Sequence, residues 1–182
     1  PLDVVEGDDE LSSDTTEVVE SEIIVCGGRG AAASAAEAKG GVVPVEIARL
    51  TDIVEVTATS SAFCARRSNG HVVAWGRAAE GGNLPADIAK RADVMQVSAT
   101  SAAFAALFAD GSVRCWGSNS YGGYTTDLAG QLINVRAIYA NYYAFTALTH
   151  DGRVLTWGDS RYGGSSLSVQ ADLVQKVRAQ RI

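Results

Sequence analysis

The sequence has few of the residues from which metal sites, disulfide frameworks and membrane spans are built. Its 182 residues include three cysteines and two histidines, and Cys26, Cys64 and Cys115 lie far apart in the chain. An odd, widely spaced set of cysteines is neither a disulfide framework nor a zinc motif, so we expect free thiols packed as small apolar groups. No apolar run approaches the ~18 residues that a membrane helix requires. We therefore expect no metal, no cofactor and no membrane contact.

Basic clusters are also missing, although the charge is unevenly distributed. The net charge is −6, and residues 1–22 hold nine of the 21 acidic residues and no base. The other bases form no run, so nucleic acid is not an expected partner. Such a dense acidic segment repels itself and buries little, which predicts a solvated, partly disordered lead-in. A docking strand or a cation site is the alternative for this segment.

The most prominent feature that is present is a sequence repeat. The stretches AFCARRSNGHVVAWGRAAEGG, AFAALFADGSVRCWGSNSYGG and AFTALTHDGRVLTWGDSRYGG begin 41 residues apart, at positions 62, 103 and 144. The same spacing separates the positions that we expect to be structural anchors: Trp75, Trp116 and Trp157; Gly70, Gly111 and Gly152; and Gly82, Gly123 and Gly164. A repeat of this length is typical of solenoids and propellers, whose units bury their faces only against neighbours.

Each repeat predicts three antiparallel strands. Residues 53–58, 94–99 and 135–140 alternate apolar and polar residues, as a first strand does. Asn-Gly or Asp-Gly dipeptides then predict a tight hairpin between the second and third strands. A weaker segment follows each double glycine and is interpreted as a short outer strand or a loop.

Each tryptophan has two possible roles. A propeller packs sheets face to face, so each sheet needs a bulky anchor and small residues where neighbours approach. We favour a buried wedge for the tryptophan over a residue that stacks on a ligand. Recurrent alanines, at positions 58, 65 and their equivalents, fit the close approach.

The stretches DGSVRCWGSNSYGG and DGRVLTWGDSRYGG resemble the repeat of the regulator of chromosome condensation family. The resemblance covers roughly residues 53–177, in a short form like that of large bacterial repeat proteins. It implies a β-propeller with four-stranded blades. The fold class expected is therefore all-β, with about four blades forming a partial propeller or a small ring.

The repeat also divides the chain. After the lead-in we expect a degenerate unit with an insertion (23–52), three full units (53–93, 94–134 and 135–173) and the start of a further unit (174–182). The chain begins without an initiator Met, so we expect a piece of a longer protein. Incomplete propellers expose sheet faces, which predicts self-association, coverage by the rest of a longer parent, or closure as a four-bladed ring.

The functional prediction is a non-catalytic scaffold that presents propeller loops to a protein or glycan partner. Repetition supplies surface without a catalytic constellation, and no catalytic residues are predicted. One alternative, implied by the resemblance, is a guanine-nucleotide-exchange-like regulator of a small GTPase. The other is an enzyme whose dispersed acidic residues converge. Gly28, Gly30 and Ala33 have dinucleotide-binding spacing, but a β repeat follows them, so we interpret them as a glycine-flanked helical turn.

Overall fold

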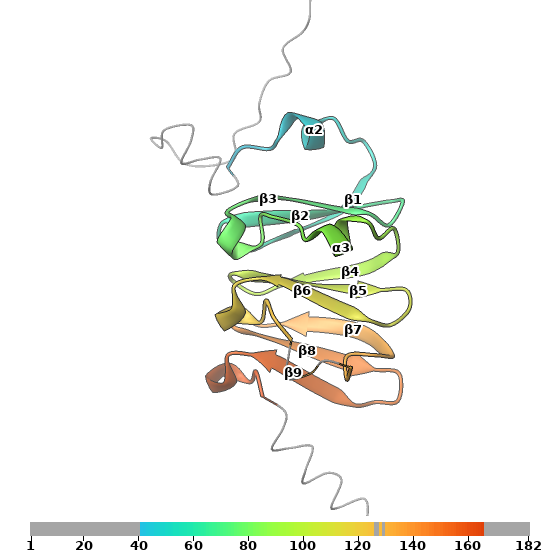
Figure 1. Cartoon of the computed structure of the whole chain (residues 1–182), viewed down its shortest axis with the longest axis vertical. Helices are drawn as coiled ribbons and strands as arrows, with labels where there is room; N and C mark the ends of the chain where they lie inside the picture. The colour runs from blue at the N-terminus through green and yellow to red at the C-terminus, as the bar shows by residue number, and fades with distance from the viewer. Residues whose placement is uncertain (1–40, 126–127, 129, 166–182) are drawn as a thin grey trace, which may run out of the picture.

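Three antiparallel sheets stacked on one another make up the structure (Figure 1). The computed structural model describes residues 41–125, 128 and 130–165. The first sheet contains β1 (Ile53–Ala58), β2 (Ala62–Arg67) and β3 (Val72–Gly76); the second contains β4 (Val94–Ala99), β5 (Ala103–Phe108) and β6 (Val113–Gly117); the third contains β7 (Val135–Ala140), β8 (Ala144–Thr149) and β9 (Val154–Gly158). The fold is all-β, as predicted, and in the described part of the chain the sheets do not close into a ring. We call these sheets blades 1, 2 and 3.

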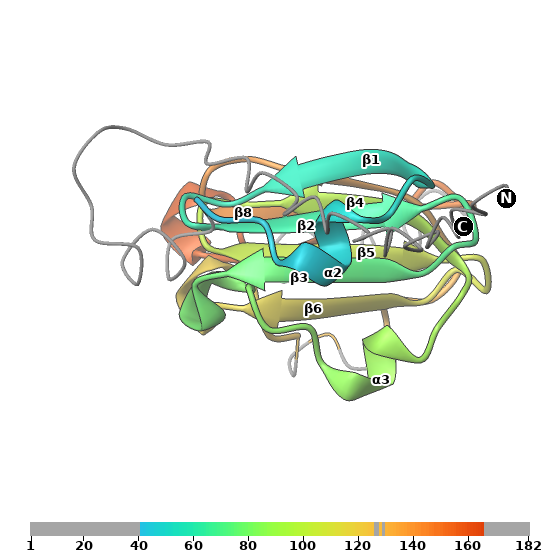
Figure 2. The same ribbon diagram turned by 90° about the horizontal axis from the view of Figure 1, so that it is seen from above.

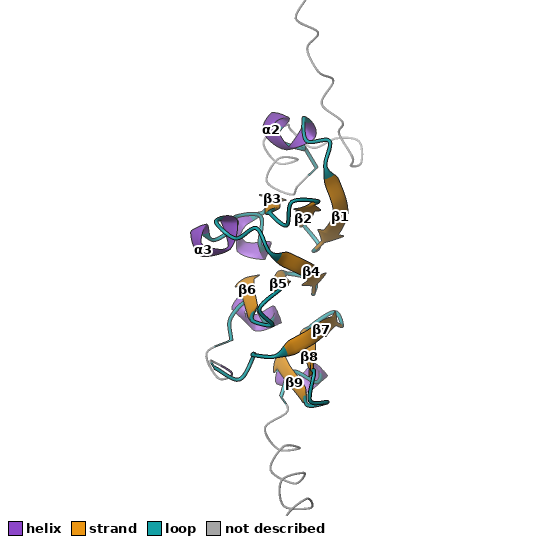
Figure 3. Cartoon of the chain, turned by 90° about the vertical axis from the view of Figure 1, so that its right-hand side faces the viewer, coloured by secondary structure: helices purple, strands orange, loops and turns teal. Residues whose placement is uncertain are grey.

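The blades repeat in detail. Their first strands start at Ile53, Val94 and Val135, 41 residues apart, and each carries an irregularity in its register just after this residue. The predicted hairpins are confirmed, since β2 pairs with β3, β5 with β6 and β8 with β9. Figure 3 shows the first strands along one side of the stack and the third strands along the other. Equivalent residues therefore occupy equivalent places in each blade.

The expectation of four-stranded blades is wrong for the described residues, because each sheet has three strands. In the segment after blade 1, the place of an outer strand is taken by the short helix α3 (Ala86–Ala89). Pro85 precedes this helix, and proline cannot donate to a strand ladder. Ile88 is the buried residue of α3 and joins the core between blades 1 and 2. A similar helix, α2 (Val45–Ala48), lies 41 residues earlier, and none of its residues is buried.

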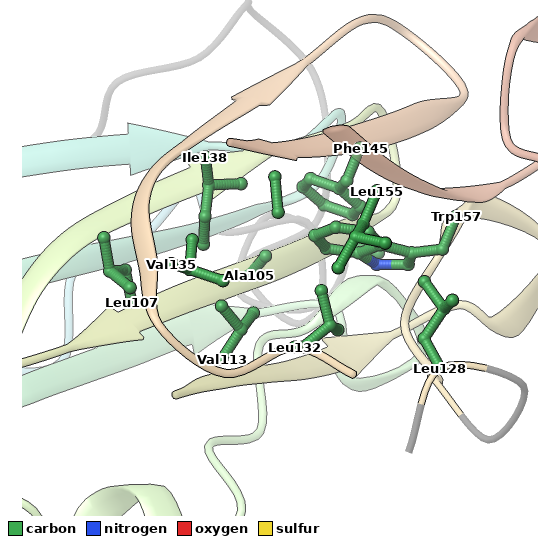
Figure 4. Close-up of a cluster of buried hydrophobic side chains, with 12 residues drawn as sticks. Ala105, Leu107, Val113, Leu128, Leu132, Val135, Ile138, Phe145, Leu155 and Trp157 are labelled. Carbon is green, nitrogen blue, oxygen red and sulfur yellow. The ribbon is translucent and has the colours of Figure 1, made fainter. Parts of the chain in front are cut away.

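The hydrophobic core lies between the blades, in two clusters of the same design. The cluster between blades 2 and 3 is drawn in Figure 4, where side chains from β5 and β6 point toward those from β7, β8 and β9. Leu128 and Leu132, from the segment between these blades, pack against the same cluster. The cluster between blades 1 and 2 joins Ala62, Cys64 and Val72 to Val94, Val97, Phe104, Ala106, Phe108 and Trp116. Each blade is therefore stabilised by burial against its neighbour.

Small residues allow this close approach at only one of the two predicted positions. Ala65, Ala106 and Ala147, in the central strands, are buried almost completely. Ala58 and Ala140 are exposed, because they end the edge strand of their sheets. The prediction that these two alanines also lie between blades is wrong.

An aromatic pair on each blade contacts a glycine of the blade before it. Phe104 stacks on Trp116 with ring centroids 5.2 Å apart, and the Trp116 indole Nε1–H donates to the Gly81 carbonyl at 2.9 Å. Gly81 has φ +98°, and a Cβ added there would lie 2.5 Å from a ring carbon of Phe104. The contact recurs one blade later, where Trp157 donates to the Gly122 carbonyl at 3.2 Å. We call this arrangement the glycine–aromatic contact.

Backbone hydrogen bonds reinforce the stacking at both ends of the strands. Val94 N donates to the Gly70 carbonyl and Val135 N to the Gly111 carbonyl, each at 3.0 Å. At the opposite end, Ser60 N donates to the Ser101 carbonyl at 2.8 Å. Because these bonds also recur with the repeat, they fix the distance between neighbouring blades.

Several predictions from the sequence fall on residues outside the described ranges. They are the acidic lead-in (1–22), most of the degenerate unit with Cys26 and the glycines at 28 and 30, and the further unit at 174–182. The unit boundaries stay predictions.

Replacing a buried indole tests the anchor role. We expect Trp116→Ala to lower the free energy of unfolding by ~3–5 kcal/mol, since it removes a buried ring and leaves the Gly81 carbonyl without its donor. Trp75→Ala should cost less, because Trp75 is only half-buried and its Nε1 has no partner. Urea denaturation measures both values; a loss below ~1 kcal/mol for Trp116→Ala would contradict the anchor role.

Matched glycine variants test the close approach. Gly81 and Gly163 have similar φ values, +98° and +92°, so alanine strains the backbone equally at both. At Gly81 the new Cβ also meets the Phe104 ring, whereas at Gly163 no described atom lies within 4 Å. We expect Gly81→Ala to be more destabilising than Gly163→Ala by ~1–3 kcal/mol. Denaturation at low protein concentration provides the comparison, and equal losses would show that the ring contact is unimportant.

Candidate functional site

The anchors predicted from the sequence lie at both ends of the blades and in the core, and do not form one site. Trp116 and Trp157 are buried between blades, and Trp75 is half-buried on the outer face of blade 1. Gly70, Gly111 and Gly152 occupy the hairpin turns, with φ between +76° and +82°. Gly82, Gly123 and Gly164 pack on the chain at the opposite end, where an added Cβ would lie within 2.6 Å of the preceding Trp-Gly glycine. These positions build the scaffold, so a functional surface must be sought elsewhere.

One end of the stack collects the loops that differ between repeats. The turns between first and second strands meet there with three short 3-10 helices: η1 (Ala78–Glu80), η2 (Asn119–Tyr121) and η4 (Ser160–Tyr162). In Figure 1 the helices form a column on the left, and Figure 2, looking along the stack, shows them gathered at the same end. Because adjacent strands are antiparallel, the end of strand one and the end of strand three necessarily lie together.

A polar side chain after each first strand holds these loops in place. Thr100 Oγ1 donates to the Tyr121 carbonyl at 3.0 Å, and Thr59 Oγ1 lies 3.2 Å from the Glu80 carbonyl. In blade 3 the residue is Asn141, whose Nδ2 donates to the Tyr162 carbonyl at 2.9 Å. Its Oδ1 also accepts from the backbone of residues 143 and 144. The loops are therefore preorganised by the blades that carry them.

Four tyrosines gather on this end of blades 2 and 3. The ring of Tyr143 stacks on Tyr162 at a centroid distance of 4.0 Å and on Tyr121 at 5.7 Å. Tyr142 meets Tyr143 edge to face at 4.7 Å. Tyr142 and Tyr162 are exposed, whereas the other two rings are partly covered. We call Tyr121, Tyr142, Tyr143 and Tyr162 the tyrosine surface.

Charge at the edge of the tyrosine surface is locally balanced. Arg161 lies 5.7 Å from the centroid of Tyr162 and donates two hydrogen bonds to the Asp159 carboxylate, at 2.7 and 3.0 Å. The hydrogen bonds from Arg161 lower the pKa of Asp159. Desolvation, together with the neighbouring tyrosines, raises the pKa of Tyr143. The rings therefore stay neutral near pH 7 and present an apolar surface with hydroxyl groups.

A groove continues the tyrosine surface toward blade 1. It encloses about 290 Å³ and is lined by Ser60, Arg77, Ala79, Glu80, Ser101, Ala102, Ser118, Tyr121 and Tyr142. Arg77 forms an ion pair with Glu80 at 3.0 Å, so the groove carries both charges. A second cavity, of about 330 Å³, lies beside Tyr124 and Trp157 and is bordered by the incompletely described segment 126–129.

Sequence reasoning missed the tyrosine surface. Positions 142 and 143 correspond to Ser101 and Ala102 in blade 2, so the third repeat departs from the pattern where the scaffold does not constrain it. A search for residues that break the repeat rather than follow it would have found Tyr142 and Tyr143. That the rings stack on Tyr121 and Tyr162, 20 or more residues away, is visible only in the structure.

The described carboxylates give little support to an acidic catalytic site. Arg67 and Arg91 lower the pKa of Asp52 and Asp93, mainly through side-chain hydrogen bonds to them. Groups held ionised in this way are poor general acids near pH 7. Among the described residues no three His, Cys, Asp or Glu side chains could hold a metal ion together. The helices in the described ranges are all too short or too polar to span a membrane.

The fold and surface define a repeat protein of stacked antiparallel blades. Residues 94–122 match the family model of the Regulator of chromosome condensation (RCC1) repeat, which confirms the resemblance seen in the sequence. The match covers blade 2 from the start of β4 to η2. No curated protein matches the chain significantly.

Solved structures provide further similarities. Prp20p from Saccharomyces cerevisiae shares 22% identity over 64% of this chain and 34% of its own, with a TM-score of 0.48. Human WBSCR16 shares 17% over 65% of this chain and 37% of its own, with a TM-score of 0.44. The Physcomitrella patens receptor kinase CR4 ectodomain shares 22% over 59% and 28%, with a TM-score of 0.43. The chain thus spans only about a third of the length of these structures.

The two described cysteines should be chemically inert in the folded protein. Desolvation raises the pKa of both Cys64 and Cys115 to about 12. Because the thiolate is the reactive form, iodoacetamide at pH 8 should leave both unmodified until denaturant is added. Peptide mass spectrometry gives the modified fraction at each position. Rapid modification of Cys115 in the native protein would contradict its burial between blades 2 and 3.

Proposed function

We propose that this chain is a non-catalytic interaction scaffold that binds a protein partner through the tyrosine surface. The observation that carries the proposal is the cluster of four tyrosines, two of them exposed, at one end of a rigid stack. Tyrosine and arginine are enriched in protein interfaces, where few residues supply most of the binding free energy. The exposed guanidinium of Arg161 beside Tyr162 fits the same pattern.

Preorganisation supports this proposal. Binding costs the entropy of ordering side chains and loops, and this cost falls when the loops are already held. The hydrogen bonds from Thr100 and Asn141 to the 3-10 helices hold the loops before a partner arrives. A tyrosine ring has few rotatable bonds, so it provides a large contact area at a small entropic cost.

The tyrosine surface is tested by removing its exposed rings. We expect the double variant Tyr142→Ala, Tyr162→Ala to lose at least ~10-fold in affinity for the partner, since aromatic anchors carry most of the binding free energy. Both rings are exposed, so the free energy of unfolding should change by less than ~1 kcal/mol. Proteins retained on the immobilised wild type and variants, quantified by mass spectrometry, identify the partner, and titration then gives the affinities.

Tyr139→Ala is the matched control, because Tyr139 is equally exposed but lies on β7 outside the tyrosine surface. A partner retained by the wild type and the control but lost from the double variant supports the proposal. Equal retention by all three would refute it. Small GTPases without nucleotide and a glycan array belong in the same panel, since they represent the GTPase and glycan alternatives.

A further inference from the structure

The outer face of blade 3 leaves uncovered what the other blades bury. Val72 and Val113 begin the third strands of blades 1 and 2 and are 3% and 2% exposed, because the next blade covers them. Val154 begins the third strand of blade 3 and is 50% exposed. Gly163 likewise corresponds to Gly81 and Gly122, but no Phe ring of a following blade packs on it in the described part of the chain. This face holds the glycine half of the glycine–aromatic contact.

The outer face of blade 1 carries the opposite half. Val97 and Ile138 lie in the first strands of blades 2 and 3 and are 4% and 1% exposed, whereas the equivalent Val56 is 57% exposed. Phe63 stacks on Trp75 at 5.3 Å as in the other blades, but both rings are only partly covered. The Trp75 Nε1–H lacks the carbonyl acceptor that Trp116 and Trp157 have. A buried donor without an acceptor is unfavourable.

The segment before blade 1 does not fill this face in the described residues. Helix α2 has no buried residue, and Ile47 stays partly exposed while its equivalent in α3, Ile88, is 1% exposed. The difference arises because Ile88 is packed between two blades and Ile47 has a blade on one side only. An apolar face of this kind marks a docking site.

We propose that copies of this chain associate head to tail, with blade 1 of one copy docking on blade 3 of the next. Phe63 and Trp75 of one copy then pack on Gly163 of the other, and Trp75 Nε1–H donates to the Gly163 carbonyl. The occupant is a second copy because the two faces are the two halves of an interface that the chain already forms twice internally. The interface is heterologous, so it joins unlike faces and repeats from copy to copy.

Single charged substitutions at each face test this arrangement. Sedimentation velocity on the full chain should show a mass that rises with concentration beyond that of one chain. Val154→Arg and Val56→Arg each place a guanidinium in the proposed apolar interface, so each variant alone should sediment as a monomer. An equimolar mixture should give a species of two chains and nothing larger, because the intact blade 1 of the first variant fits the intact blade 3 of the second.

Val54→Arg is the matched control. Val54 is exposed on the same strand as Val56, and its equivalent in blade 3 is Arg136, which is exposed beside an intact blade interface. This variant should assemble like the wild type. Since all three replaced side chains are exposed in the single chain, circular dichroism should show unchanged folding.

Three results would overturn the proposal. They are a wild type that is monomeric at every concentration, a Val56→Arg or Val154→Arg variant that still associates alone, and a mixture of the two that stays monomeric. Persistent association of one variant indicates contact between like faces. The test is independent of partner binding, because Tyr142→Ala, Tyr162→Ala leaves Val56, Val154 and Gly163 unchanged and should assemble normally.

Discussion

The contact between an aromatic pair and a glycine on the preceding blade holds this stack together. The Phe104 ring occupies the space that a side chain at position 81 would fill, and Trp116 donates to the carbonyl of that glycine. A bulkier residue at 81 would separate the sheets and expose both hydrophobic faces. Because the contact recurs at Gly122, it sets a constant separation, and the remaining core is filled by small and β-branched residues matched to that separation.

This design makes stability a property of neighbouring pairs rather than of single blades. A three-stranded sheet of this size buries too little on its own, and here each cluster draws its side chains from two blades. The terminal blades therefore keep one face that is incompletely buried, as terminal repeats do in stacked proteins generally. Val56 and Val154 show the result: the same residue type at repeated positions changes from buried to exposed where the described stack ends.

The repeat also separates structure from recognition. Trp, Phe and Gly recur at fixed positions because the blade interface constrains them, whereas the loops at one end carry Ser101 in one blade and Tyr142 in the next. Loops on a rigid scaffold can change without loss of the core. The tyrosine surface uses this freedom, since its rings come from two blades, and Thr100 and Asn141 fix the loops that carry them.

The sequence by itself determined the period, the three strands of each unit and the hairpins, because the 41-residue spacing, the alternation and the Asn-Gly and Asp-Gly dipeptides are local signals. It did not determine that the segment with Ile88 forms a helix rather than a fourth strand, because that depends on the gap between two blades. Only the tertiary structure brings Tyr121, Tyr143 and Tyr162 together, since stacking of distant loops leaves no spacing in the chain. It also decided that Trp75 and Trp116, identical in their repeats, differ in burial, because burial depends on the neighbouring blade.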